Sequence, residues 1–255
     1  MDARIYAWSK QHPTLDVSLA QALHDHAVDN ALRELVRCCE LVGVMGGHSL
    51  ARGSADYAAA SYLAQELTVR GLTVATGGGP GAMEAANLGA YLARRSRTEL
   101  DEALGILATV PLFKPSVQDW ATTAFDVLAR WPEGERSLGI PTWHYGHEPP
   151  NAFATEIAKY FKNAIREDIL LQISAAGIVF LPGAAGTVQE VFQDACENYY
   201  SDPSSVAPMI LVGRRYWTED VPVWTLLQSL ARGRDMESLV HLVDDVSEVP
   251  ALLAR

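Results

Sequence analysis

Two glycine-rich turns constrain the fold of this chain more than any other feature. The first is TGGGPGAME at 76–84 and the second is PGAAGTVQE at 182–190. Each stands between a short apolar run, typical of a buried strand, and a longer helical pattern. In a parallel sheet with crossover helices, such turns lie at the carboxyl ends of the strands, where ligands bind. The pattern predicts an α/β protein of doubly wound, Rossmann-like type, with helices on both faces of a parallel sheet.

The same alternation of short and long apolar patterns runs along most of the 255 residues. It predicts strands at 41–45, 72–76, 104–110, 177–181 and 208–213, and helices at 19–39, 54–70, 81 to about 97, 153–174, from the second glycine turn to 199, and from 217 onward. The proline-rich stretch 111–150 is predicted to be an irregular excursion that covers or borders a site. We expect a single domain over 1–255, with an N-terminal helical extension at 1–40.

Charge and apolar runs exclude several classes of partner. The formal net charge of −11 argues against a nucleic-acid-binding protein, which normally carries a basic face. We expect no membrane partner and a cytoplasmic location, because no apolar run has the length of a membrane span and the N-terminus lacks a signal-peptide core. The three cysteines include no Cys-x-x-Cys pair. The segment WHYGHE at 143–148 resembles a metal-ligand cluster, but it lacks helical spacing and we interpret it as a loop.

The glycine turns suit an anionic ligand. Consecutive glycines let the backbone touch a ligand, and the helix that follows presents unpaired N–H groups to an anion. Neither turn matches G-x-G-x-x-G or G-K-[ST], which disfavours a dinucleotide dehydrogenase and a P-loop phosphohydrolase. We therefore expect a mononucleotide or sugar phosphate held by backbone groups, with its phosphate against Gly79, Gly81, Gly186 and Thr187.

The two turns resemble the signatures of the Lonely Guy (LOG) family, whose members are also known as lysine decarboxylase-like nucleotide-binding proteins. The resemblance rests on TGGGPGAMEAANLGA at 76–90 and PGAAGTVQE at 182–190, and extends from about Leu41 to the C-terminal LVDDVSEVPALL. The chain differs from the family pattern at Ala184, where the motif has a glycine. It also has Glu167 after Arg166, where the family usually has a lysine.

The resemblance implies hydrolysis of the N-glycosidic bond of a nucleoside 5′-monophosphate, such as a cytokinin riboside monophosphate, to free base and ribose 5-phosphate. It also implies a homodimer or higher homo-oligomer with no metal and no organic cofactor. By motif position, Glu190 and Arg166 are the expected catalytic residues. The expected nucleotide- or phosphate-binding residues are Gly77, Gly78, Gly79, Gly81, Met83, Glu84, Asn87, Pro182, Gly183, Gly186 and Thr187. The alternative is a non-catalytic nucleotide- or molybdenum-cofactor-binding protein of the same fold.

Several of these residues also have purely structural interpretations. Glu190 follows Thr187 by three residues, which is the spacing of a capping box that would only fix a helix start. If it is catalytic instead, its carboxylate would stabilise an oxocarbenium-like ribose or activate water. Arg166 would clamp a phosphate or the leaving base, or form a surface salt bridge. Glu84 would favour the helix dipole, and Asn87 would bind a loop.

Overall fold

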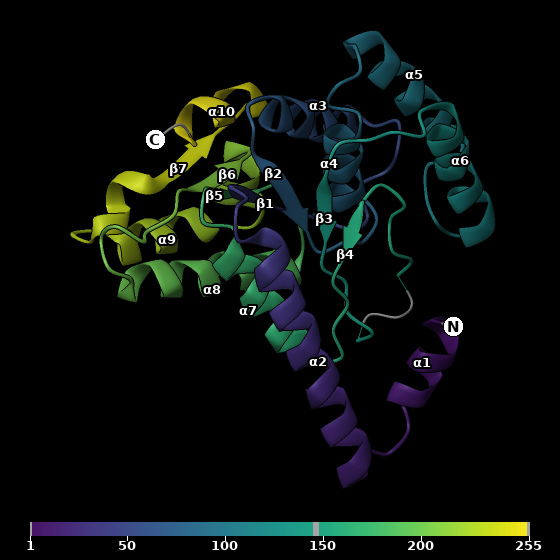
Figure 1. Cartoon of the computed structure of the whole chain (residues 1–255). Coiled ribbons are helices and arrows are strands. Elements are labelled where there is room, and N and C mark those ends of the chain that lie inside the picture. The colour runs from purple at the N-terminus through teal and green to yellow at the C-terminus, as the bar shows by residue number, and fades with distance from the viewer. Residues whose placement is uncertain (1, 145–147, 254–255) are drawn as a thin grey trace.

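The computed structural model describes residues 2–144 and 148–253 and contains one sheet of seven parallel strands (Figure 1). The strand order is β4-β3-β2-β1-β5-β6-β7. The strands are β1 (Leu41–Met45), β2 (Thr73–Thr76), β3 (Ser137–Gly139), β4 (Glu156–Ile157), β5 (Gly177–Phe180), β6 (Met209–Val212) and β7 (Val240–Val243). The chain builds outward from β1 to β4 and then returns to place β5 beside β1. The predicted doubly wound fold is confirmed, and its strand order reverses at β1.

Helices cover both faces of this sheet. Buried side chains of α3 (Ala55–Val69), α4 (Ala82–Tyr91), α5 (Arg97–Ala108), α6 (Val117–Arg130) and α10 (Val249–Leu252) form one apolar cluster with the strands. Side chains of α2 (Leu15–Val36), α7 (Asn163–Ile173), α8 (Ala185–Tyr200) and α9 (Val223–Ala231) form the other. The first helix, α1 (Asp2–Ser9), buries none of its side chains. Every residue of β1 is buried, as expected for a central parallel strand covered on both faces.

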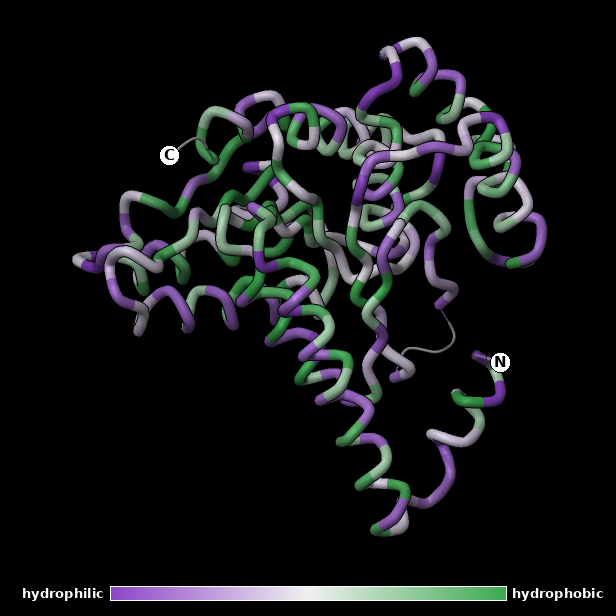
Figure 2. Tube along the Cα trace, viewed as in Figure 1, coloured by the Kyte–Doolittle hydropathy of each residue, from purple (hydrophilic) through white to green (hydrophobic). Residues whose placement is uncertain are grey.

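Helix α2 projects beyond the body of the domain, with α1 at its far end (Figure 1). Along the projecting part, hydrophobic and hydrophilic residues alternate around the helix (Figure 2). Leu15, Leu19 and Leu23 are 74%, 52% and 69% exposed. Because residues four apart share one helix face, these leucines form a single exposed apolar stripe.

The strand predicted at 104–110 is wrong, because this segment belongs to α5. Ser96 and Glu99 form a capping box at the start of α5. Leu100, Ala103, Leu104 and Leu107 are then buried at helical spacing. The apolar run is therefore the end of a helix stripe. The Ser-x-x-Glu capping signal just before it was the feature that distinguished the two structures.

The proline-rich stretch 111–150 is not irregular throughout. It contains α6, whose Trp120, Ala124 and Val127 are buried at helical spacing, and the three-residue strand β3. The helix predicted at 153–174 was too long, because α7 begins only at Asn163 and the short strand β4 precedes it. Strands of two or three residues leave no periodic signal in a sequence, which is why β3 and β4 were missed.

The region after residue 217 was predicted to be helical only. The structure adds β7 at the edge of the sheet, where it pairs with β6 from Met209↔Val240 to Val212↔Val243. The helices found there are α9, α10 and three short turns at Tyr216–Asp220, Asp235–Leu239 and Val246–Glu248. Within the described ranges 2–144 and 148–253, no helix combines the length and the apolar character that crossing a membrane requires.

Candidate functional site

A cavity of about 310 Å³ lies at the carboxyl ends of the central strands, where the strand order reverses. Three loops supply its floor: the one after β1, the glycine turn after β2 and the glycine turn after β5. Residues of the proline-rich stretch, among them Pro141, Thr142, Pro149 and Pro150, form another wall. A volume of this size falls in the range of about 300–1,000 Å³ that holds small ligands.

The loop after β1 ties the two glycine turns together through Gly47. Its N–H donates to the carbonyl of Pro182 at 3.0 Å, and its carbonyl accepts from the N–H of Ala82 at 3.1 Å. A Cβ on Gly81 would overlap the Gly47 carbonyl, and one on Gly183 would overlap Thr187. Gly81, Pro182 and Gly183 thus hold the loops together, and they are not among the residues that line the cavity.

Gly77, Gly78 and Gly79 do line the cavity, together with Met83. A Cβ on Gly77 would lie 2.9 Å from the Met83 sulfur and 3.3 Å from Nη1 of Arg166, and one on Gly79 would lie 2.8 Å from the Met83 methyl. Gly78 has φ +71°, a left-handed conformation that glycine adopts without strain. The first turn therefore needs glycine partly for its own packing against Met83 and Arg166.

The N-terminus of α8 opens into the cavity. Ala184, Ala185, Gly186 and Thr187 all line it, and no side chain of the described residues caps this helix end. The first N–H groups of a helix have no partner within the helix, so this end presents donors and a positive dipole to the cavity. Ala184 has φ −79° and ψ −154°, which an alanine adopts as readily as the glycine it replaces.

The capping-box interpretation of Glu190 is wrong. The N-cap of α8 is Ala184, so Thr187 is the third residue of the helix and Glu190 the sixth. Glu190 lies in the second turn of α8, one turn later than the sequence suggested, and its carboxylate is not engaged in a cap. It lines the cavity with only 13% of its side chain exposed.

Arg166 and Glu190 meet in the cavity wall. Nη1 of Arg166 lies 3.6 Å from Oε1 of Glu190, and the Arg166 side chain is 8% exposed. The surface-salt-bridge interpretation of Arg166 is therefore wrong. Burial raises the pKa of Glu190 to about 7; the charge of Arg166 opposes this shift and that of Glu167 adds to it. A carboxyl group with a pKa near neutrality can both take up and release a proton.

A polar network fixes Glu167 beside this pair. Its carboxylate lies 3.7 Å from Nη2 of Arg166 and accepts hydrogen bonds from Asn163 at 2.7 Å and Gln189 at 2.6 Å. Nη2 of Arg166 also donates to Asn163. Nε of Arg166 is buried and has no hydrogen-bond partner among the described residues. The guanidinium therefore keeps one buried donor without a hydrogen bond.

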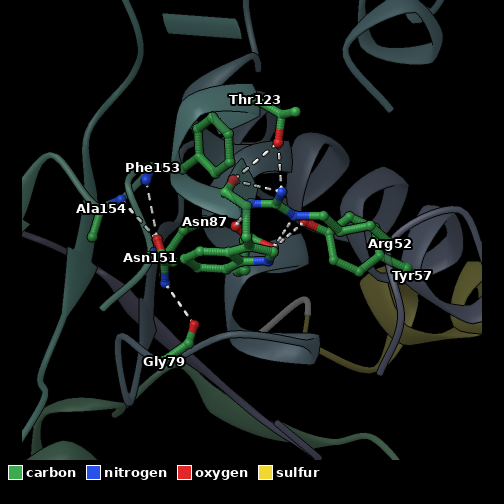
Figure 3. Close-up of polar contacts among 10 residues, drawn as sticks. Arg52, Tyr57, Gly79, Asn87, Thr123, Asn151, Phe153 and Ala154 are labelled. Atoms are coloured by element: carbon green, nitrogen blue, oxygen red, sulfur yellow. Dashed lines mark hydrogen bonds and ion pairs between the residues drawn. The ribbon is translucent and has the colours of Figure 1, made fainter. Parts of the chain in front are cut away.

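Glu84, predicted to bind the nucleotide, is fully buried outside the lining of the cavity. Its carboxylate accepts from both sides of the Arg52 guanidinium, at 2.8 and 2.5 Å, and from the Tyr57 hydroxyl at 2.9 Å. Arg52 also donates to Thr123 and to the carbonyl of Trp120, as Figure 3 shows in part. Glu84 thus joins α4 to α3 and α6.

Asn87 is also fully buried and does not line the cavity. Its Oδ1 accepts from Thr76 at 2.7 Å and from Asn151 at 3.0 Å. Asn151 donates in turn to the carbonyl of Gly79, and its N–H donates to that of Gly78 (Figure 3). Asn87 and Asn151 therefore fix the conformation of the first glycine turn from its buried side, away from the cavity.

The structure also brings to the cavity residues that the motifs did not indicate. His48, in the loop after β1, forms an ion pair of 3.6 Å with Glu148, and Lys159 follows β4. Residues 145–147 of the segment WHYGHE lie outside the described ranges. Among the residues that the structure describes, no group of three or more His, Cys, Asp or Glu side chains is placed to hold a metal. The position of GGHS after a buried strand was the available signal for His48.

Solved structures of this fold include two molybdenum-cofactor proteins. The chain matches the molybdenum cofactor carrier protein MCP of Chlamydomonas reinhardtii with a TM-score of 0.51 and 19% identity, over 85% of this chain and 99% of that one. It matches the molybdenum cofactor binding protein of the phototrophic bacterium Rippkaea orientalis with a TM-score of 0.50 and 18% identity, over 84% and 95%. At these identities the likeness concerns the fold alone. No curated protein sequence matches the chain.

A family model described as "possible lysine decarboxylase" matches residues 127–253. This range includes Arg166, the second glycine turn and Glu190, and it spans five strands of the sheet, from β3 to β7. This match confirms the resemblance to the Lonely Guy (LOG) family over the C-terminal half of the chain, which holds the second of the two glycine turns.

Proposed function

We propose that the protein hydrolyses the N-glycosidic bond of a nucleoside 5′-monophosphate, releasing free base and ribose 5-phosphate. The observation that carries this proposal is Glu190, a carboxyl group with a pKa of about 7 beside Arg166 in the wall of the cavity. Glu190 forms no cap, and a buried acid with a raised pKa in a cavity wall is typical of catalytic sites.

The phosphate of the nucleotide is placed at the N-terminus of α8. Unpaired N–H groups and the helix dipole favour an anion there, and Gly186 leaves room for close approach because nothing lies within 4 Å of the position of its absent Cβ. Gly77, Gly78 and Gly79 face the same cavity. Arg166 lines the same cavity and supplies a positive charge for the ligand.

Glu190 then lies beside the sugar. It is five residues after the start of α8, which is about 7 Å along the helix axis, and helical side chains lean back toward the N-terminus. In the proposed reaction the bond between C1′ and the base nitrogen breaks, and the electron pair leaves with the base. A water oxygen forms the new bond to C1′ and gives its proton to the Glu190 carboxylate, and the departing base nitrogen takes up a proton from solvent.

The second candidate is binding of a phosphorylated ligand without turnover. It is favoured by the two structures of the same fold, which by their names carry or bind a molybdenum cofactor. The residues present fit a phosphorylated anion of that kind as cargo, because the open N-terminus of α8 and the guanidinium of Arg166 line a cavity of sufficient size. In this case Glu190 and Arg166 hold the ligand and break no bond.

Self-association completes the proposal. We assign the exposed leucine stripe of α2, formed by Leu15, Leu19 and Leu23, to contact with a second copy of this chain. A stripe of leucines four residues apart on a projecting helix is suited to helix–helix packing, and burying it removes apolar surface from water. The proposed species is a homodimer or a higher homo-oligomer in the cytoplasm.

The test is a panel of nucleoside 5′-monophosphates, each paired with the nucleoside that lacks the phosphate, assayed for free base and ribose 5-phosphate. We expect base release from at least one monophosphate and none from its nucleoside, because the phosphate positions the sugar. Tight binding of monophosphates without base release would favour the carrier alternative. If the protein neither binds any monophosphate nor releases base from one, both candidate functions are refuted.

A further inference from the structure

One carboxylate of α1, that of Asp2, accepts from two donors in a distant part of the chain, and one of these donors, Lys159, lines the cavity. Nζ of Lys159 donates to Oδ1 of Asp2 at 2.7 Å, and Nε1 of Trp143 donates to the same oxygen at 2.8 Å. Lys159 lines the cavity, and so does Thr142, the residue before Trp143. Two donors that converge on one oxygen form a site for an anion, here occupied by Asp2.

The donors belong to a rigid part of the fold. The Trp143 side chain is 7% exposed and stacks on Phe161 with 4.3 Å between ring centroids. The backbone N–H of Trp143 donates to the carbonyl of Tyr160 at 3.0 Å, which extends the pairing of β3 and β4. The Lys159 ammonium lies 4.9 Å from the Trp143 ring centroid. The two donors are therefore placed by the sheet and not by α1.

Helix α1, in contrast, is lightly attached. It buries no side chain, and Asp2 is 60% exposed. Apart from Asp2, its described contacts include an edge contact of Trp8 with Phe161 and a 3.3 Å hydrogen bond from Lys10, just beyond the helix, to the carbonyl of His144. Its apolar side chains Ile5, Tyr6 and Trp8 are only half-buried, so α1 separates from the rest of the chain at lower cost than a helix of the core.

The charges of the cavity give an anionic ligand a reason to displace Asp2. The ionisable acids in the lining are Glu148, Glu167 and Glu190, and its permanent cations are Lys159 and Arg166. Arg166 already faces two of these acids, and Asp2 neutralises Lys159. An anionic group that takes the place of Asp2 gains the lysine and the indole N–H, and removes a carboxylate from the cavity edge.

We propose that Lys159 and Trp143 form a second anion subsite of the cavity, occupied by Asp2 in the free protein. A phosphorylated ligand that carries a second, separate anionic group displaces Asp2 and releases α1. The inference rests on the proposed function in one respect, that the first phosphate binds at the glycine turns. It adds to that function a ligand class, a nucleotide with two separate anionic groups, and an N-terminal helix that competes with it.

The test measures hydrogen–deuterium exchange of the α1 amides and ligand affinity together. The probes are adenosine 5′-monophosphate, adenosine 3′,5′-bisphosphate and inorganic phosphate. We expect the bisphosphate to accelerate α1 exchange about tenfold or more, and the monophosphate to leave it unchanged. Asp2→Asn should release α1 without ligand and raise bisphosphate affinity about tenfold, whereas Asp16→Asn, the matched change in the first turn of α2, should do neither.

Lys159→Met decides whether the subsite is real. Combined with Asp2→Asn, it should abolish the preference for the bisphosphate over the monophosphate. The inference would be overturned by two results together. The exchange of α1 would be unchanged with both the bisphosphate and inorganic phosphate, and the bisphosphate would bind Asp2→Asn and the unmutated protein with equal affinity. If the protein does not hydrolyse nucleotides, adenosine 5′-monophosphate will bind without releasing base, and the exchange results above will be unaffected. If the first phosphate does not bind at the glycine turns, adenosine 5′-monophosphate will not bind any variant. The subsite will still be established in that case if inorganic phosphate releases α1 in the unmutated protein and does not release it in Lys159→Met.

Discussion

Nη1 of Arg166 lies 3.6 Å from Oε1 of Glu190, and both side chains are almost fully buried in the wall of the cavity. The two residues come from α7 and α8, which flank β5 in the chain. The guanidinium favours the charged carboxylate, yet burial dominates and the pKa of Glu190 remains near 7. The pair therefore combines a fixed positive charge with an acid that changes its protonation state around neutrality.

The stability of the protein should depend on pH through Glu190. The pKa is raised from 4.5 to about 7 in the folded state, so the folded protein holds a proton that the unfolded chain has lost. The free energy of unfolding contributed by this group therefore falls as pH rises from about 4.5 to 7, and is constant above. Glu190→Gln should remove this part of the pH dependence, up to about 3 kcal/mol between pH 5 and pH 8 in urea unfolding.

The control for this experiment is Glu34→Gln, whose side chain is 74% exposed. It should leave the pH profile of the unfolding free energy unchanged. Parallel profiles for Glu190→Gln and the unmutated protein would show that the pKa of Glu190 is not raised.

Gly186 and Gly105 form a matched pair for testing the phosphate position. Both are helical, and an added Cβ would meet nothing within 4 Å at either position. Alanine at either site should leave the protein folded and raise its stability by up to about 1 kcal/mol. Only Gly186→Ala should weaken nucleotide binding, about tenfold or more, because its methyl group occupies the place of the phosphate. Equal affinities by isothermal titration calorimetry would place the phosphate elsewhere.

The buried ion pair of Arg52 and Glu84 should be essential for folding. Their side chains are 1% and 0% exposed, so Glu84→Gln leaves the guanidinium of Arg52 buried without a counter-charge. We expect a loss of about 3–5 kcal/mol in the free energy of unfolding, measured by urea denaturation. Glu66→Gln, which breaks the exposed pair with Arg70, should cost at most about 1 kcal/mol. A similar small cost for both would indicate that Glu84 does not hold the fold.

The leucine stripe of α2 should determine the oligomeric state. Leu19→Glu places a charge in the middle of the stripe and should yield a monomer by sedimentation velocity. Ala20→Glu adds the same charge about 100° around the helix and should leave the assembly intact. A dimer that survives Leu19→Glu would place the interface on another surface.

The central sheet was predictable because its strands are continuous apolar runs bounded by glycine turns. The turns at 76–84 and 182–190 also located the cavity, since both follow buried strands that the fold places near one another. The wall formed by Pro141, Thr142 and Lys159 was not predictable in the same detail. It depends on β3 and β4, which are too short to produce a pattern.

Motif position alone did not separate ligand contacts from internal supports. Glu84 and Asn87 belong to the same motif as Gly77 and Met83, yet they face inward to Arg52 and Asn151. The difference lies in helix phase, which a spacing of one or two residues changes by 100–200°. Asn151 itself has no sequence signal, because its role follows from its contact with a turn 72 residues earlier.

The most direct test of the account compares Glu190→Gln with the unmutated protein on the same nucleoside 5′-monophosphate. Equilibrium binding and release of free base are measured in parallel, with Glu197→Gln, a change on the same helix outside the cavity lining, as the control. We expect Glu190→Gln to bind the nucleotide with nearly unchanged affinity. Its rate of base release should be lower than that of the unmutated protein by about 10²-fold or more. Base release by Glu190→Gln at the rate of the unmutated protein would contradict it.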